Sequence, residues 1–180
     1  DSLRVSYHGE IADKDTALIS RTVLTGYLEA ARPDGQVNIV NSPAVAHDMG
    51  LELVDSVINA KTEYNELIVA ELGKDGKKFR VAGTIIGQSP RIVEIDRLFV
   101  DTNIKGHFLI VRNDDRPGIV GLVGSALGAA GLNIANLSLA RNKTKGDALN
   151  VIELDTSPDA EIIQSLTDAP GILSVTAVDI

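Results

Sequence analysis

Residues 107–178 alternate between strand-like and helix-like patterns in an order that restricts the fold more than any other feature of the chain. The strand-like runs are rich in Val, Ile and Leu, and the helix-like runs carry apolar residues three and four positions apart. The predicted strands are 107–113, 132–141, 147–155 and 171–178, and the predicted helices are 117–130 and 158–167. We expect the first helix to bury Val120, Val123, Leu127 and Ala130. The order is that of the split βαβ, or ferredoxin-like, plan, βαββαβ.

The first 100 residues show a different pattern, with helices followed by a mostly antiparallel sheet. Alternating apolar residues predict a strand over residues 3–7, helical spacing continues to Leu28, and a short strand is expected at 37–39. Hairpin signals lie at 73–76 and at Asp96-Arg97. Because residues 101–106 turn polar, we place a domain boundary there. The prediction is an α+β protein with domains 1–104 and 105–180.

Composition excludes several classes of function. The formal net charge of −8 and the absence of a basic run disfavour nucleic-acid binding. With no cysteine, disulfides, thiolate metal sites and iron–sulfur ligands are excluded. No 18-residue apolar stretch or signal segment occurs, so we expect a cytoplasmic protein without membrane association.

The chain lacks the motifs of a self-contained enzyme. It carries no Gly-x-Gly-x-x-Gly and no Gly-x-x-x-x-Gly-Lys-Ser/Thr, and its three histidines are scattered. We therefore predict no catalytic residues, no metal and no bound cofactor in this chain. The only methionine is Met49 and the first residue is Asp1, so we expect the chain to be a piece of a longer protein.

The most informative segment is Asn113-Asp-Asp-Arg-Pro-Gly118, between a predicted strand and a predicted helix. Asp115 can act as the N-cap, with Pro117 in the first turn. The free N–H groups of that turn suit a carboxylate, and a neighbouring acidic side chain suits an ammonium group. Asn133 follows the helix, and we expect its amide to point to the same end of the sheet as Asn113. A capped turn without any ligand explains the same residues equally well.

The segments just described resemble a known family, D-3-phosphoglycerate dehydrogenase. Residues 109–124 and 131–136 match the family's ACT motif: a strand, Asn/Asp-x-Asp-x-Pro-Gly, a helix and then Gly-x-Asn-Ile. Pro170-Gly-Ile-Leu-Ser-Val175 matches its usual ending. Residues 7–12, 38–46, 81–87 and 90–93 resemble the intervening, or allosteric substrate-binding, domain of the long form.

The resemblance implies a regulatory role in L-serine biosynthesis. The whole enzyme would be an NAD-dependent oxidoreductase, and L-serine, or another small amino acid, would inhibit it allosterically by binding between paired ACT domains of a homo-oligomer. Asn113 and Asp115 would hold the amino acid in one subunit, and Asn133 would contact it from the partner. Arg91 matches a position of the family's anion site, but the simpler interpretation is that it is a surface residue.

The chain departs from the family pattern at two residues, and two alternative assignments stay open. Asn103 and Glu153 stand where some relatives have arginine, which puts the anion site in question. The same domain pair occurs in iron–sulfur L-serine dehydratases, so the chain could be the regulatory portion of such a lyase. A free-standing amino-acid sensor is the other alternative.

Overall fold

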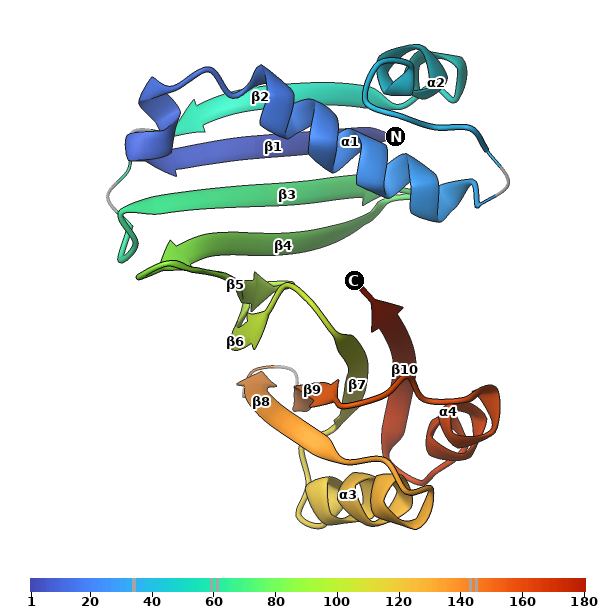
Figure 1. The fold of residues 1–180 in the computed structure, drawn as a ribbon. Coiled ribbons are helices and arrows are strands. Elements are labelled where there is room, and N and C mark those ends of the chain that lie inside the picture. Colours follow the sequence, from blue (N-terminus) through green and yellow to red (C-terminus); the bar gives the residue numbers. More distant parts are fainter. Residues whose placement is uncertain (34, 59, 61, 143, 145) are drawn as a thin grey trace. The chain divides into compact units, whose positions relative to one another are not determined.

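The computed structural model describes every residue except 34, 59, 61, 143 and 145, and the chain divides into two compact units. Unit 1 comprises Asp1–Gln88 and Ile95–Arg97, and unit 2 comprises Ser89–Glu94 and Leu98–Ile180. The described residues form four α-helices and two sheets, so the prediction of a mixed helix-and-sheet protein is confirmed (Figure 1). The expected domain boundary at residue 104 stays a prediction. Asp34 and two residues of the expected 142–146 turn lie outside the described residues.

Unit 1 is a twisted sheet with two helices on one face. Its strands follow the order β2-β1-β3-β4, and only the β1–β2 pair is parallel. Leu3, Val5 and Tyr7 of β1 are buried toward the helices, as their alternation predicts, and Leu24 and Leu28 of α1 pack on Leu3. The elements are β1 (Ser2–Gly9), the 3-10 helix η1 (Glu10–Asp13), α1 (Ala17–Ala31), α2 (Ser42–Asp48), β2 (Glu52–Ile58), β3 (Glu66–Lys74) and β4 (Lys77–Ile86).

The short strand expected at residues 37–39 does not form. The Asn38 side-chain oxygen accepts hydrogen bonds from the backbone N–H groups of Val40 and Asn41, at 2.9 and 3.0 Å. The backbone N–H groups therefore bond to the Asn38 side chain and not to a neighbouring strand. For this reason the alternating apolar residues Val37 and Ile39 do not form a strand.

A buried polar network ties α1 to two strands of unit 1. The Tyr7 hydroxyl is buried, contacts the Ser20 hydroxyl, and donates to the carbonyl oxygen of Thr16 at 3.2 Å. The Ser20 hydroxyl in turn donates to the Asp55 carboxylate on β2. Removal from water raises the pKa of Tyr7 above its ordinary value of 10.0, and the charge of Asp55 acts in the same direction.

We expect Tyr7→Phe to lower the free energy of unfolding by about 1–2 kcal/mol at neutral pH, since buried groups lose a hydrogen-bond partner. The folded chain holds the phenolic proton more tightly than the unfolded chain. The contribution of Tyr7 to stability should therefore be constant below about pH 10 and should fall as the pH rises beyond it. Urea unfolding at pH 7 to 11 measures both effects.

The matched control for this experiment is Tyr27→Phe, because Tyr27 packs only at the edge of the α1 core. The control should keep the alkaline loss of stability, whereas Tyr7→Phe should show a weaker loss. An identical alkaline slope in the unaltered chain and in Tyr7→Phe would show that the buried hydroxyl is not responsible.

Unit 2 contains a four-stranded antiparallel sheet in the order β10-β7-β9-β8. Residues 89–103 form a hairpin whose turn residues, Asp96 and Arg97, are assigned to unit 1 and both have positive φ, as the turn prediction requires. The elements are β5 (Ser89–Ile95), β6 (Leu98–Asn103), β7 (His107–Asp114), α3 (Ile119–Ala129), β8 (Ile134–Asn142), β9 (Asp147–Leu154), α4 (Ala160–Thr167) and β10 (Ile172–Asp179).

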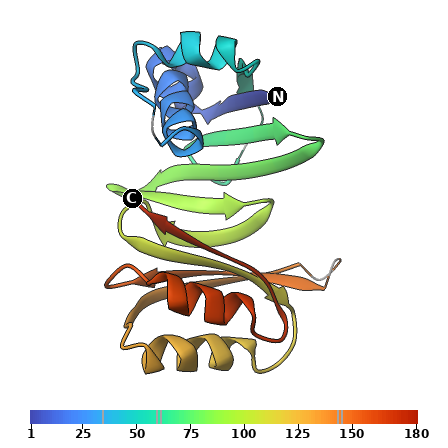
Figure 2. The same cartoon turned by 90° about the vertical axis from the view of Figure 1, so that its right-hand side faces the viewer.

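The core of unit 2 lies between this sheet and the two helices on one of its faces (Figure 2). Leu109 and Ile152 from the sheet meet Val123 and Leu127 of α3 there. The predicted buried face of α3 is wrong at two of its four residues, because Val120 and Ala130 are exposed and Ala130 lies just beyond the end of the helix. The helix begins at Ile119, two residues later than expected, and buries Ile119 with Val123 and Leu127, so Val120 is 46% exposed.

Candidate functional site

Asn113 lies at the end of β7, on the face of the sheet that the helices cover. Its side chain is buried, and its Oδ1 accepts a hydrogen bond of 2.6 Å from Nδ2 of Asn150 on β9. Its own Nδ2 donates to the carbonyl oxygen of Asp114 at 2.6 Å. Asn150 is equally buried, and its Oδ1 has no partner among the described residues. The two amides therefore fix one another's orientation beneath the start of α3.

Asp115 follows two residues later and is held by Arg141 of β8. The Nε–H group of Arg141 donates to both carboxylate oxygens of Asp115, at 2.9 and 2.8 Å. The Asp115 backbone N–H donates to the carbonyl oxygen of Gly146 at 3.1 Å. The prediction that Asp115 caps the helix is wrong: because α3 begins at Ile119, the N-cap position passes to Gly118, where no side chain caps the helix.

The strand register explains how Arg141 reaches this place. Ala148 of β9 lies opposite Asn113 of β7 and opposite Arg141 of β8, so all three share the face that carries the helices. Sequence reasoning missed Arg141 and Asn150. A signal for Arg141 existed, since Leu137 lies four residues earlier, on the same face of the strand, and packs on the core.

Asn133 lies at the opposite end of the sheet from Asn113, so the expectation that both point to one end is wrong. Ile134, which follows Asn133, pairs with Leu154, and Leu154 also pairs with His107 at the start of β7. The six residue steps from His107 to Asn113 span about 20 Å. The crossover through α3 returns the chain to the beginning of β8, which runs parallel to β7 with β9 between them, and this is the physical reason. The Asn133 amide donates to Asp155 at 2.7 Å.

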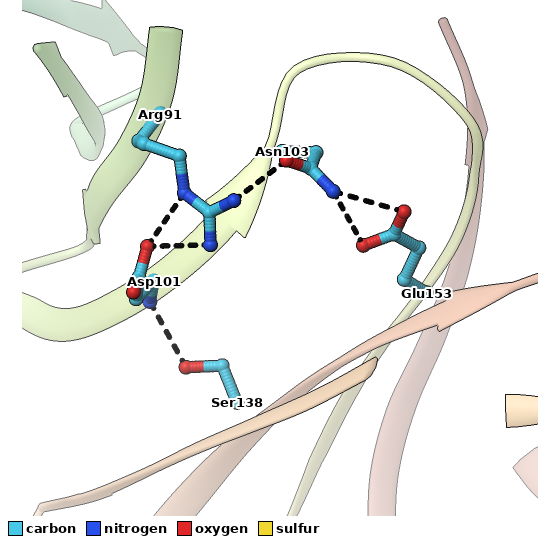
Figure 3. A network of polar contacts seen from close by, with 5 residues as sticks. All are labelled: Arg91, Asp101, Asn103, Ser138 and Glu153. Carbon is cyan, nitrogen blue, oxygen red and sulfur yellow. Dashed lines mark hydrogen bonds and ion pairs between the residues drawn. The ribbon is translucent and has the colours of Figure 1, made fainter. Parts of the chain in front are cut away.

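Arg91 belongs to a polar network within unit 2 that also contains both departures from the family pattern (Figure 3). Its guanidinium contacts the Asp101 carboxylate at 2.7 Å and Oδ1 of Asn103 at 2.6 Å. The Asn103 amide then donates to both carboxylate oxygens of Glu153 at 3.0 Å. The Arg91 side chain is 21% exposed, and its guanidinium is held by the Asp101 and Asn103 side chains.

The formal charge of this network is −1, because one guanidinium faces two carboxylates. Asp101 takes the position at Arg91 that an incoming anion would need, and Glu153 adds a second negative charge nearby. An anion would have to displace Asp101 before it could pair with Arg91.

A serine, a histidine and an aspartate meet near the Asn133 end of the sheet. Nδ1 of His107 lies 2.7 Å from Asp179, and the Ser157 hydroxyl donates to the same carboxylate at 3.1 Å. Hydrogen bonding to His107 lowers the pKa of Asp179, with a smaller contribution from Ser157. Because the carboxylate and not the imidazole contacts the hydroxyl, the order differs from that of an activated nucleophile.

Among residues 1–180 apart from the five undescribed ones, no cluster of three or more His, Asp or Glu side chains is placed to hold a metal ion. Within the same residues, no helix is long and apolar enough to cross a membrane.

One family model and several known proteins are similar to this chain. Residues 1–96 match the family model described as D-3-phosphoglycerate dehydrogenase intervening domain. Proteins named D-3-phosphoglycerate dehydrogenase are 31% identical in Bacillus subtilis, 30% in Archaeoglobus fulgidus and 32% in Methanocaldococcus jannaschii. The matches cover 98%, 99% and 97% of this chain but only 34%, 34% and 33% of those proteins, so the chain spans about a third of their length. These similarities confirm the resemblance seen in the sequence.

Proposed function

The chain belongs to the D-3-phosphoglycerate dehydrogenase intervening-domain family, and on this basis we propose that it is the regulatory part of such a dehydrogenase. The NAD-dependent oxidation step of L-serine biosynthesis then resides in the two thirds of the relatives that this chain does not match. The names of these relatives favour the dehydrogenase over the dehydratase alternative.

Unit 2 supports an ACT-type assignment for the second half of the chain. Its elements β7, α3, β8, β9, α4 and β10 follow the order expected for a βαββαβ domain, and β7 and β9 are the central strands. Because that plan hosts many functions, the assignment depends on the residues at the end of β7 and not on topology alone.

The ligand in this proposal is L-serine, bound at the Asn113–Asp115 end of the sheet. The Asp115 carboxylate offers a partner for the α-ammonium group. The first turn of α3 has no side-chain cap, so its N–H groups are available to the α-carboxylate. Amide groups then suit the small hydroxylated side chain.

A site with all three predicted residues needs two copies of the chain. Asn133 lies about 20 Å from Asn113 along the sheet, whereas a serine molecule spans only a few ångströms. A symmetric homodimer can bring Asn133 of one copy to Asp115 of the other, because a two-fold axis creates two equivalent shared sites. This distance is the single observation that best supports binding between paired domains.

Regulation would follow because serine binding is thermodynamically linked to the arrangement of the two copies. Serine that contacts both copies stabilises the arrangement in which the shared site is closed, and the shift of that equilibrium lowers turnover of the dehydrogenase. Calorimetric titration of the chain with L-serine tests the proposal. We expect a saturable heat at millimolar serine, and the absence of heat in that range would contradict the assignment.

The possible anion site at Arg91 gives a separate prediction. We expect Asp101→Asn to tighten the binding of inorganic phosphate about tenfold, because the substitution removes the carboxylate that neutralises Arg91. Titration calorimetry with phosphate measures the change. The matched variant Glu153→Gln removes an equal charge that contacts Asn103 instead of Arg91, and its effect should be smaller. Equal phosphate affinity in Asp101→Asn and in the unaltered chain would exclude an anion site at Arg91.

A further inference from the structure

The contact between Arg141 and Asp115 leads to an inference about the ligand specificity of the proposed serine site, and this inference rests on the proposed function. We propose that Arg141 determines specificity for a zwitterionic amino acid by binding its α-carboxylate while Asp115 binds its α-ammonium group. Nothing in the local sequence near Asp115 points to Arg141, which lies 26 residues farther along the chain.

The position of Arg141 is set by the sheet and not by a flexible loop. It belongs to β8, is paired with Ala148, and lies in line with Asn113 across β9. Its Nε–H group contacts both oxygens of the Asp115 carboxylate. A positive and a negative side chain therefore meet at the end of the sheet where the amino acid is proposed to bind.

The charges of this pair are complementary to those of an α-amino acid. When the pair opens, the ligand ammonium replaces the guanidinium at Asp115, and the ligand carboxylate replaces Asp115 at Arg141. Each charge exchanges one partner for another, so no unpaired charge is created. The planar guanidinium also matches a carboxylate better than an amine does.

The opening of the pair should cost little. The Arg141 side chain is 56% exposed, although the Asp115 side chain is only 19% exposed, so the guanidinium is already largely solvated and loses little when the pair opens. The Asp115 backbone is fixed through Gly146, so the long Arg141 side chain is the part that can move. The α-carboxylate can accept hydrogen bonds from Arg141 and from the first turn of α3 together, because its two oxygens have about four acceptor positions.

The experiment compares two ligands in two variants by titration calorimetry. L-serine carries both charges, whereas ethanolamine lacks the carboxylate. We expect Arg141→Gln to weaken serine binding about tenfold or more, as the loss of a charge-assisted hydrogen bond does, without weakening ethanolamine binding. Arg21→Gln, on the exposed side of α1 in unit 1, is the matched control and should leave both affinities unchanged.

The possible outcomes separate this inference from the proposed function. If serine binds the unaltered chain and Arg141→Gln with equal affinity, the role of Arg141 is overturned while the serine site stands. If serine binds Arg141→Gln more tightly, Arg141 competes with the ligand for Asp115, which also overturns the role. If serine gives no heat with the unaltered chain, both the proposed function and this inference fail.

Discussion

Asp115→Ala is expected to weaken L-serine binding at least about 30-fold, because truncation of one partner of a charge-assisted pair costs about 2 kcal/mol or more. The substitution removes the only carboxylate that contacts Arg141 among the described contacts, and with it the proposed partner of the ligand ammonium. Stability should change little, since the Arg141 side chain stays largely solvated. Calorimetry with serine and thermal unfolding measure the two effects separately.

Glu161→Ala is the matched control for this variant. Glu161 is an exposed carboxylate in the first turn of α4, in the same unit, and its removal changes the net charge by the same amount. The control should bind serine as the unaltered chain does. If the two variants weaken serine binding equally, a general charge effect and not a contact at Asp115 is responsible.

Gly9→Ala should produce the largest loss of stability that we predict, more than about 3 kcal/mol in the free energy of unfolding. Gly9 ends β1 with φ +75°, a conformation that costs other residues energy. An added Cβ would also lie 2.0 Å from the carbonyl oxygen of Asn65, which already accepts a hydrogen bond from the backbone N–H of Glu10. A backbone oxygen cannot move aside without disturbing the pairing of β1 with β3.

Gly50 offers a matched control in the same unit. It has φ +66°, but nothing lies within 4 Å of an added Cβ, so Gly50→Ala isolates the cost of the conformation, about 1 kcal/mol. Urea unfolding of both variants gives the difference that the clash accounts for. Equal losses in the two variants would contradict a clash at Asn65.

The sequence predicted local features of the fold well. The order of strands and helices in unit 2 follows from hydrophobic periodicity, and the turn at Asp96-Arg97 follows from residue type, because both signals are carried by neighbouring residues. Prediction from hydrophobic alternation fails where a polar side chain offers the backbone another partner, as Asn38 does when it forms a turn in place of a strand. The position of the helix cap was also wrong, because α3 starts later than expected and its N-cap is Gly118 instead of Asp115.

The candidate site was predictable only for residues that are close together in the sequence. Asn113 and Asp115 are neighbours in sequence, so their proximity needed no knowledge of the sheet. Arg141 and Asn150 reach them through strand register, which is set by pairings 26 to 37 residues apart and leaves little trace in any short segment. The same register separates Asn133 from Asn113, which the spacing of the residues along the chain does not reveal.

The measurement that tests the central proposal most directly is serine binding to a mixture of two defective variants. Asp115→Ala and Asn133→Ala should each lose serine binding when studied alone. If the site is shared between two copies, a 1:1 mixture allowed to exchange subunits forms mixed dimers in which one of the two sites is intact, which restores about a quarter of the sites. Equilibrium dialysis with labelled L-serine counts them. Recovery of that fraction is the predicted result, and a mixture that binds no more serine than either variant alone would contradict a site shared between paired domains.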